Sequence, residues 1–190
     1  MFKYLVLIFI AFIIGISTPV FAQNKIYIAP ETAVTWKDTG GDEVLDMGGL
    51  AADDLAVGSF LDLGANSRSS DYVFTFFVDQ FETNPVVGES IDLYWATGTD
   101  TANFDGVVTT APGDSSTGTA VLAETPNLMY AGSAIVITTT AASAKLRISG
   151  FIRFLSRYVF PVVHNNTADA LNRTGDGHSI ILTPVPAEVQ

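Results

Sequence analysis

Short apolar runs separated by turn residues follow one another along most of the chain. Glycine, proline, asparagine and aspartate recur between these runs, and each favours backbone conformations that end a strand. The apolar runs have the length of strands and cover residues 25–28, 33–36, 59–63, 72–81, 90–96, 119–122, 134–139, 145–163 and 179–182. Many short strands at regular spacing are typical of a sandwich or barrel. The pattern predicts an all-β fold, an antiparallel, jelly-roll-like β-sandwich of about eight strands.

The clearest alternation covers residues 144–158. Even positions are mostly apolar, whereas odd positions include four basic side chains. These basic residues are Lys145, Arg147, Arg153 and Arg157. A period of two predicts one half-buried antiparallel strand, in which Gly150 marks a bend or bulge. The basic face either pairs with acidic residues on neighbouring strands of the same molecule or forms an interface with the acidic loops of an adjacent copy.

Residues 72–81 differ from this pattern because aromatic side chains occupy both parities. A strand that is buried on both faces has such a sequence. The alternative is that one face meets a neighbouring subunit. Residues 43–57 are the one plausible helical segment, but Gly48 and Gly49 interrupt it, so we expect a loop there with at most one turn of helix.

The first 22 residues have the features of a secretory signal peptide. Lys3 precedes an apolar run over residues 4–16, and small residues occupy the cleavage positions that end at Ala22. The run is shorter than the roughly 20 residues that span a bilayer, although an uncleaved anchor over residues 4–22 is an alternative. We therefore predict cleavage after Ala22, export to the periplasm, cell surface or medium, and a single domain over residues 23–190.

Composition narrows the range of partners. The chain carries 20 acidic and 9 basic residues, a net charge of −11. Such a surface repels phosphate backbones and anionic lipid, so we expect no nucleic-acid partner, and membrane contact only through an uncleaved signal segment. The sequence contains no cysteine, so packing must stabilise the fold without disulfides.

The sequence offers little catalytic chemistry. His164 and His178 are the two histidines, and neither a G-x-S-x-G elbow nor an H-E-x-x-H zinc motif is present. Neighbouring carboxylates along a strand point to opposite faces and do not form a glycosidase pair. We predict that the protein is not an enzyme and has no organic cofactor.

One segment has the oxygen ligands of a calcium site. Asp100, Asn103 and Asp105 are spaced by three and two residues and are followed by glycine, but Thr101 and Pro112 do not fit an EF-hand loop. The two interpretations are a looser calcium site between strands and a plain Asp-Gly turn.

Several segments have a familiar order. Residues 57–64, 84–94, 156–171 and 181–185 together resemble small β-sandwich proteins encoded among the virion structural genes of tailed bacteriophages, and the resemblance extends over residues 35–186. It implies a decoration or tail-associated role on the virion, without catalytic residues.

Two functional hypotheses follow. The first is a non-enzymatic structural protein that packs with its own copies or with a larger assembly, on a virion or at the cell surface. The alternative is a secreted glycan-binding module that uses exposed aromatic residues. The candidates are Trp36, Trp95 and Tyr94, although we expect both tryptophans in the core. The sequon at Asn165 is interpreted as a coincidence.

Overall fold

The computed structural model describes residues 31–64, 69–100, 104, 128–172 and 177–185, all within one compact unit, Ala29–Ala187. The predicted signal peptide lies outside the described residues. No helix in the described part of the chain is long and apolar enough to cross a membrane.

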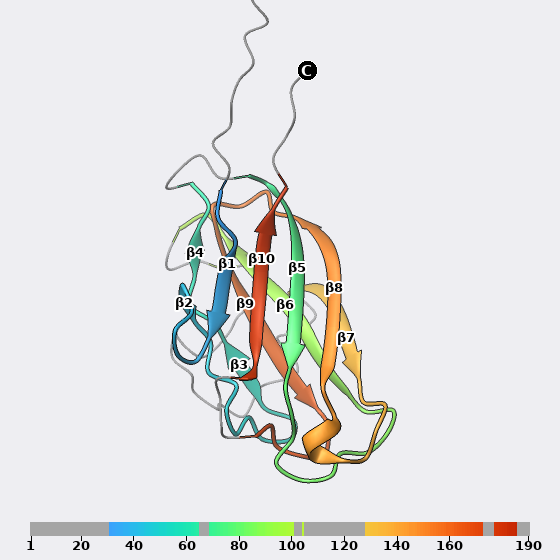
Figure 1. Cartoon of the computed structure of the whole chain (residues 1–190). Coiled ribbons are helices and arrows are strands. Elements are labelled where there is room, and N and C mark those ends of the chain that lie inside the picture. Colours follow the sequence, from blue (N-terminus) through green and yellow to red (C-terminus); the bar gives the residue numbers. More distant parts are fainter. Residues whose placement is uncertain (1–30, 65–68, 101–103, 105–127, 173–176, 186–190) are drawn as a thin grey trace, which may run out of the picture. The chain divides into compact units, whose positions relative to one another are not determined.

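Two sheets form the fold (Figure 1). The first sheet has the order β2-β1-β10-β5-β8, with the bounds β2 Glu43–Val44, β1 Val34–Lys37, β10 Ser179–Pro184, β5 Asp71–Val78 and β8 Leu146–Arg153. The second has the order β3-β9-β6-β7, with β3 Leu55–Val57, β9 Tyr158–Asn166, β6 Ser90–Gly98 and β7 Met129–Ile135, while β4, Leu61–Asp62, also pairs with β9. Neighbouring strands are antiparallel apart from β1 and β2. A short 3-10 turn, η2, covers Ala141–Ser143.

The prediction of an all-β sandwich is confirmed. The described residues form ten strands rather than about eight, and the difference is two strands of two residues each, β2 and β4. The expected loop over residues 43–57 is also present. Within it, only residues 43–44 and 55–57 pair as strands, and no helix forms.

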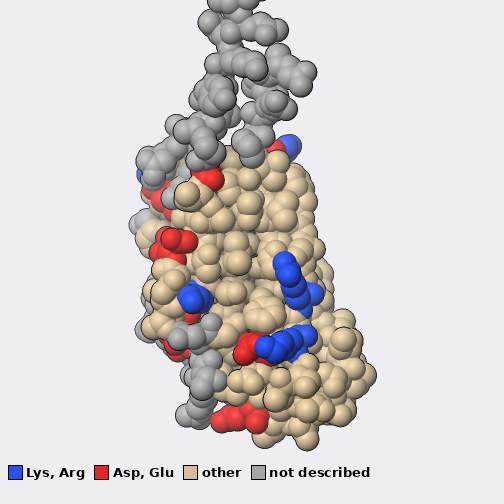
Figure 2. Space-filling model, in the orientation of Figure 1, with Lys and Arg blue, Asp and Glu red and all other residues tan. Residues whose placement is uncertain are grey.

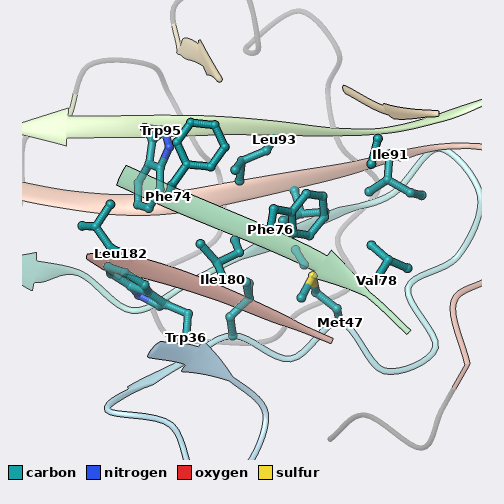
Figure 3. Close-up of a cluster of buried hydrophobic side chains, with 14 of the residues drawn as sticks. Trp36, Met47, Phe74, Phe76, Val78, Ile91, Leu93, Trp95, Ile180 and Leu182 are labelled. Carbon is teal, nitrogen blue, oxygen red and sulfur yellow. The ribbon is translucent and has the colours of Figure 1, made fainter. Parts of the chain in front are cut away.

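Alternate residues of both sheets fill the space between them (Figure 3). Trp36 of β1 and Trp95 of β6 are fully buried and meet edge to face, with ring centroids 5.6 Å apart. The Trp36 indole donates a hydrogen bond to the carbonyl of Ser59 at 2.9 Å. Each large apolar side chain buried in this way contributes about 1.5–3 kcal/mol to stability. Both tryptophans are therefore core residues, as expected.

The strand that is buried on both faces is not the one predicted. β5 alternates between buried and accessible residues, Phe77 lies on its open face, and Phe81 lies beyond its end. β9 is instead buried on both sides, because one face meets the main core and the other is covered by a second apolar cluster. Val159 and Val163 face the main core, whereas Phe160 and Val162 belong to a second apolar cluster.

The alternating segment 144–158 is also two strands rather than one. β8 ends at Arg153, a turn follows, and β9 begins at Tyr158 in the other sheet. The turn keeps the alternation because Phe154 stays buried while Leu155 is 92% exposed. No bulge occurs at Gly150, since the pairing of β8 with β5 runs through it without a register shift.

Gly150 has a different function. It lies directly opposite Phe74 of β5, and a Cβ at this position would come within 2.7 Å of the Phe74 ring. The glycine therefore provides space for an aromatic ring in the core. The register shift that the structure does contain lies between β6 and β7, at Leu93 and Tyr94.

Candidate interaction surface

Three of the four predicted interface residues form ion pairs within the chain. Lys145 Nζ lies 2.6 Å from Asp79 Oδ1. Arg153 on β8 lies opposite Asp71 on β5, and its Nη2 donates to Asp71 Oδ2 at 2.8 Å. The hydrogen bond from Arg153 lowers the pKa of the Asp71 carboxyl, because it favours the charged form.

The other two basic residues differ from each other. Arg157 donates two hydrogen bonds, each 2.9 Å long, to the Asp62 carboxylate, and it lies in the turn before β9 rather than on β8. Arg147, opposite Phe77, forms no ion pair with the described residues. The intramolecular pairs leave Arg147 as the available cation of this group, and an interface built on these residues stays a prediction.

The calcium hypothesis also remains a prediction. Asp100 follows the end of β6, whereas Asn103 and Asp105 lie outside the described residues. Among the described residues, no group of three or more histidine, aspartate or glutamate side chains is arranged to hold a metal ion.

Both histidines are buried. His178 Nδ1 accepts a hydrogen bond from the backbone N–H of Asp79 at 3.2 Å, and its Nε2 lies 3.3 Å from the carbonyl of Asn172. These partners require a neutral ring that carries its proton on Nε2. Burial lowers the pKa of His178 because the charged ring loses its hydration. His178 thus joins the end of β5 to the loop after β9.

His164 lies beside a polar network on the outer face of the second sheet. Its Nδ1 is 4.0 Å from Asp92 Oδ2, and its Nε2 has no hydrogen-bond partner among the described residues. Asp92 Oδ1 accepts hydrogen bonds from the hydroxyls of Ser90 and Ser133. Both serine hydroxyls are thus directed to the carboxylate, and the network links β7, β6 and β9 across the sheet.

Tyr130 is an exposed aromatic residue that sequence reasoning did not single out. It is 57% exposed on β7, and its ring centroid lies 5.4 Å from that of the half-buried Tyr94. The Tyr130 hydroxyl is 2.6 Å from Ser133 Oγ. Trp36 and Trp95 are fully buried, so Tyr94 is the one predicted glycan-binding residue that a ligand can reach. Tyr130 beside it is a second accessible aromatic residue.

The sequon asparagine is not available for glycosylation in the folded chain. Asn165 is fully buried, and its Nδ2 donates to the carbonyls of Leu50, Ala51 and Asp169 at 2.8–3.0 Å. Its Oδ1 accepts the hydroxyl of Thr167 at 2.7 Å. This residue fastens two loops together, which explains why the sequence has an asparagine here.

The strand β7 and residues 83–88 of the loop beside it carry no charged side chain, and Glu82 and Glu89 flank this loop segment. No charged residue occurs between Glu124 and Lys145. Four exposed aliphatic side chains lie here: Val86, Val87, Ile135 and Ile137. Backbone hydrogen bonds from Gly88 N–H to the Val136 carbonyl and from Val136 N–H to the Glu89 carbonyl hold loop and strand side by side. We call these four residues the aliphatic patch. Figure 2 shows no charged residue at the corner formed by the end of β7 and η2.

The fold defines this chain as an all-β, two-sheet sandwich protein. No protein-family model and no curated protein matches it. The residues themselves must therefore carry any assignment of function.

Proposed function

We propose that this chain is an exported, non-enzymatic structural protein that packs against other protein subunits, as a decoration or tail-associated component of a virion or as part of a cell-surface assembly. The observation that carries the proposal is the uncharged aliphatic patch at one edge of an acidic sandwich. Two acidic proteins repel each other, and this repulsion is weaker where the contact itself contains no charge.

Exposure of the patch supports this function. Ile137 is 77% exposed, and Val86 and Val87 are each more than half exposed. Single exposed aliphatic residues are ordinary, but several on one uncharged surface are typical of a protein interaction site. On the strand side, residues 138–144 are threonine, alanine and serine and add no charge that a partner would have to desolvate, whereas on the loop side Glu82 and Glu89 flank Val86 and Val87.

A jelly roll is part of the proposal. When the eight strands longer than two residues are numbered in chain order, the sheets read 1-8-3-6 and 2-7-4-5. This interleaved order is typical of two Greek keys folded into a jelly roll, an architecture common in viral capsids and lectins. Fold alone does not assign a function, so the patch remains the main argument.

The test is sedimentation of the full chain, taken from the cells that produce it or from a phage lysate that contains it. The wild type is expected in a particle fraction, and Ile137→Asp is expected among free chains. Val73→Asp is the matched control, because Val73 is an exposed aliphatic residue on β5 of the other sheet. A wild type that sediments as free chains, or equal behaviour of the two variants, would contradict the proposal. The mass of the same material tests export, since cleavage removes residues 1–22.

A second function, glycan binding, is favoured by the Tyr130 site. An exposed ring beside a second ring offers a stacking platform, and the Ser133 hydroxyl and Asp92 carboxylate lie next to it as hydrogen-bonding groups. The acidic surface favours neutral over acidic sugars. Titration with neutral oligosaccharides tests this function. Saturable binding that Tyr130→Ala removes and Phe151→Ala retains would support it, since Phe151 is an exposed ring on the other sheet. Absence of binding across the panel excludes it.

A further inference from the structure

We infer that the partner at this edge is a second copy of the same chain, whose β7 pairs antiparallel with the first β7 across a two-fold axis. The inference rests on the proposed function and identifies the partner. It would join the two second sheets into one continuous sheet of ten strands, in the order β3-β9-β6-β7 followed by its two-fold repeat, with β4 beside β9 in each copy.

The four ends of the two sheets differ in how they resist such pairing. β2 and β3 are short, with two and three residues. β8 is long, but Arg147 and Arg153 point from it into solvent. Short length and edge charge are two devices by which proteins block edge-to-edge pairing. β7 has seven residues and contains neither charge nor proline. Among the described strands, it is the sheet end without either of these two devices, and the register shift in its pairing with β6 lies before Gly132, outside the segment 132–136.

The hydrogen bonds of β7 show which backbone groups are available. Val136 uses both its N–H and its carbonyl toward the β6 side, with Gly88 and Glu89. In an antiparallel strand these groups alternate in direction from one residue to the next. Between Gly132 and Val136 the pairing with β6 has no register shift, so the N–H and carbonyl groups of Ser133 and Ile135 point away from β6.

Of these two residues, Ser133 lies nearer the centre of β7 and directs both backbone groups away from β6. A two-fold axis at Ser133 places this residue opposite itself in the other copy. An antiparallel strand of identical sequence supplies the same free donors and acceptors in the reverse direction, so the pairing is self-complementary. The neutral strand also avoids like charges across the contact, which would oppose the approach of two copies elsewhere on an acidic surface.

The absence of cysteine allows a direct test by single-cysteine crosslinking of the purified mature chain. Residues at the centre of an antiparallel pair have Cα atoms about 4.5–5.5 Å apart, within the range of a disulfide. Variants Ala131→Cys, Ser133→Cys and Ile135→Cys are oxidised with copper–phenanthroline. Ser149→Cys is the matched control, because Ser149 is an exposed serine on β8, the end of the other sheet.

We expect Ser133→Cys to form a covalent dimer fastest and Ser149→Cys to stay monomeric. Light scattering should give a dimer mass for the wild type and a monomer mass for Ile135→Lys, with unchanged far-UV circular dichroism. The inference is wrong if no β7 variant crosslinks faster than Ser149→Cys. If the purified chain is monomeric while Ile137→Asp still leaves the particle fraction, the partner is a different protein and the proposed function stands. If the chain dimerises through β7 but Ile137→Asp remains in the particle, the proposed function fails and the dimer stands.

Discussion

The contact between Gly150 and Phe74 allows one substitution to be worked through. Glycine in the middle of a strand usually costs about 0.5–1 kcal/mol relative to alanine, so Gly150→Ala would stabilise an open site. Here the added Cβ would lie 2.7 Å from Cε1 and 2.8 Å from Cζ of Phe74. The Phe74 ring cannot move away easily, because it is only 2% exposed and is surrounded by the core. Overpacking of this kind costs about 1–3 kcal/mol.

The clash exceeds the gain from alanine, so Gly150→Ala should lower the free energy of unfolding by about 1–2 kcal/mol. Urea denaturation measures the loss as a lower midpoint at unchanged slope. A smaller residue at position 74 should relieve the clash, so adding Gly150→Ala to Phe74→Leu should be neutral or stabilising. The control Ser149→Ala, on the exposed face of the same strand, should change stability by no more than about 0.5 kcal/mol. A Gly150→Ala variant as stable as the wild type would refute the reasoning.

Three further predictions concern hydrogen-bonded side chains. The pKa of His178 is lowered in the folded state, so its stabilising contribution is present above the unfolded pKa of about 6.5 and is lost as pH falls below it. The variant His178→Gln should therefore make the free energy of unfolding less dependent on pH between about pH 7 and 5. An unchanged pH profile would contradict this. Asn165→Ala should cost about 3 kcal/mol in urea denaturation, since it leaves buried carbonyls without donors, and a loss as small as that of a surface variant would be inconsistent with its contacts. Arg153→Gln should shift the urea midpoint less than Gly150→Ala does, because its pair with Asp71 is exposed, and a larger shift would show that this pair is a major stabilising contact.

The sequence predicts the fold class well because strand periodicity and turn residues are local signals. The basic face of residues 144–158 is recognisable from alternation alone, and one of its two interpretations, pairing with acidic residues on neighbouring strands, matches the contacts of Lys145 and Arg153. Of the partner carboxylates, Asp71 is the first residue of β5 and Asp79 directly follows its last residue. The pairing register between β5 and β8 places these carboxylates beside the basic residues. The sequence of one strand alone does not show that register.

The errors arise where a local pattern depends on distant structure. Alternation continues from β8 through the turn at Leu155 into the next strand, so periodicity alone does not reveal that the chain changes sheet. The aromatic residues Phe77 and Phe81 suggested a doubly buried strand, but one lies on an open face and the other follows the strand. What covers the outer face of a strand is set by the remaining chain, which is why β9 rather than β5 has two buried faces.

The edge of the second sheet was missed for a related reason. Residues 134–139 were predicted as a strand, but sequence does not show which strands end a sheet. A signal was nevertheless present, since no charge occurs between Glu124 and Lys145 in a chain of net charge −11. Such a gap is informative because an unprotected edge is normally selected against.

The dependence of self-association on salt distinguishes the two candidate contact surfaces of this protein. A contact between Arg147 and the acidic loops of another copy is attractive electrostatically and weakens when salt shortens the Debye length to about 8 Å or less. A contact through β7 contains no charge, while the acidic bodies on either side repel each other. Screening that repulsion strengthens the β7 contact. Self-association that increases between low and moderate ionic strength therefore indicates the β7 edge, and self-association that decreases indicates the basic residues.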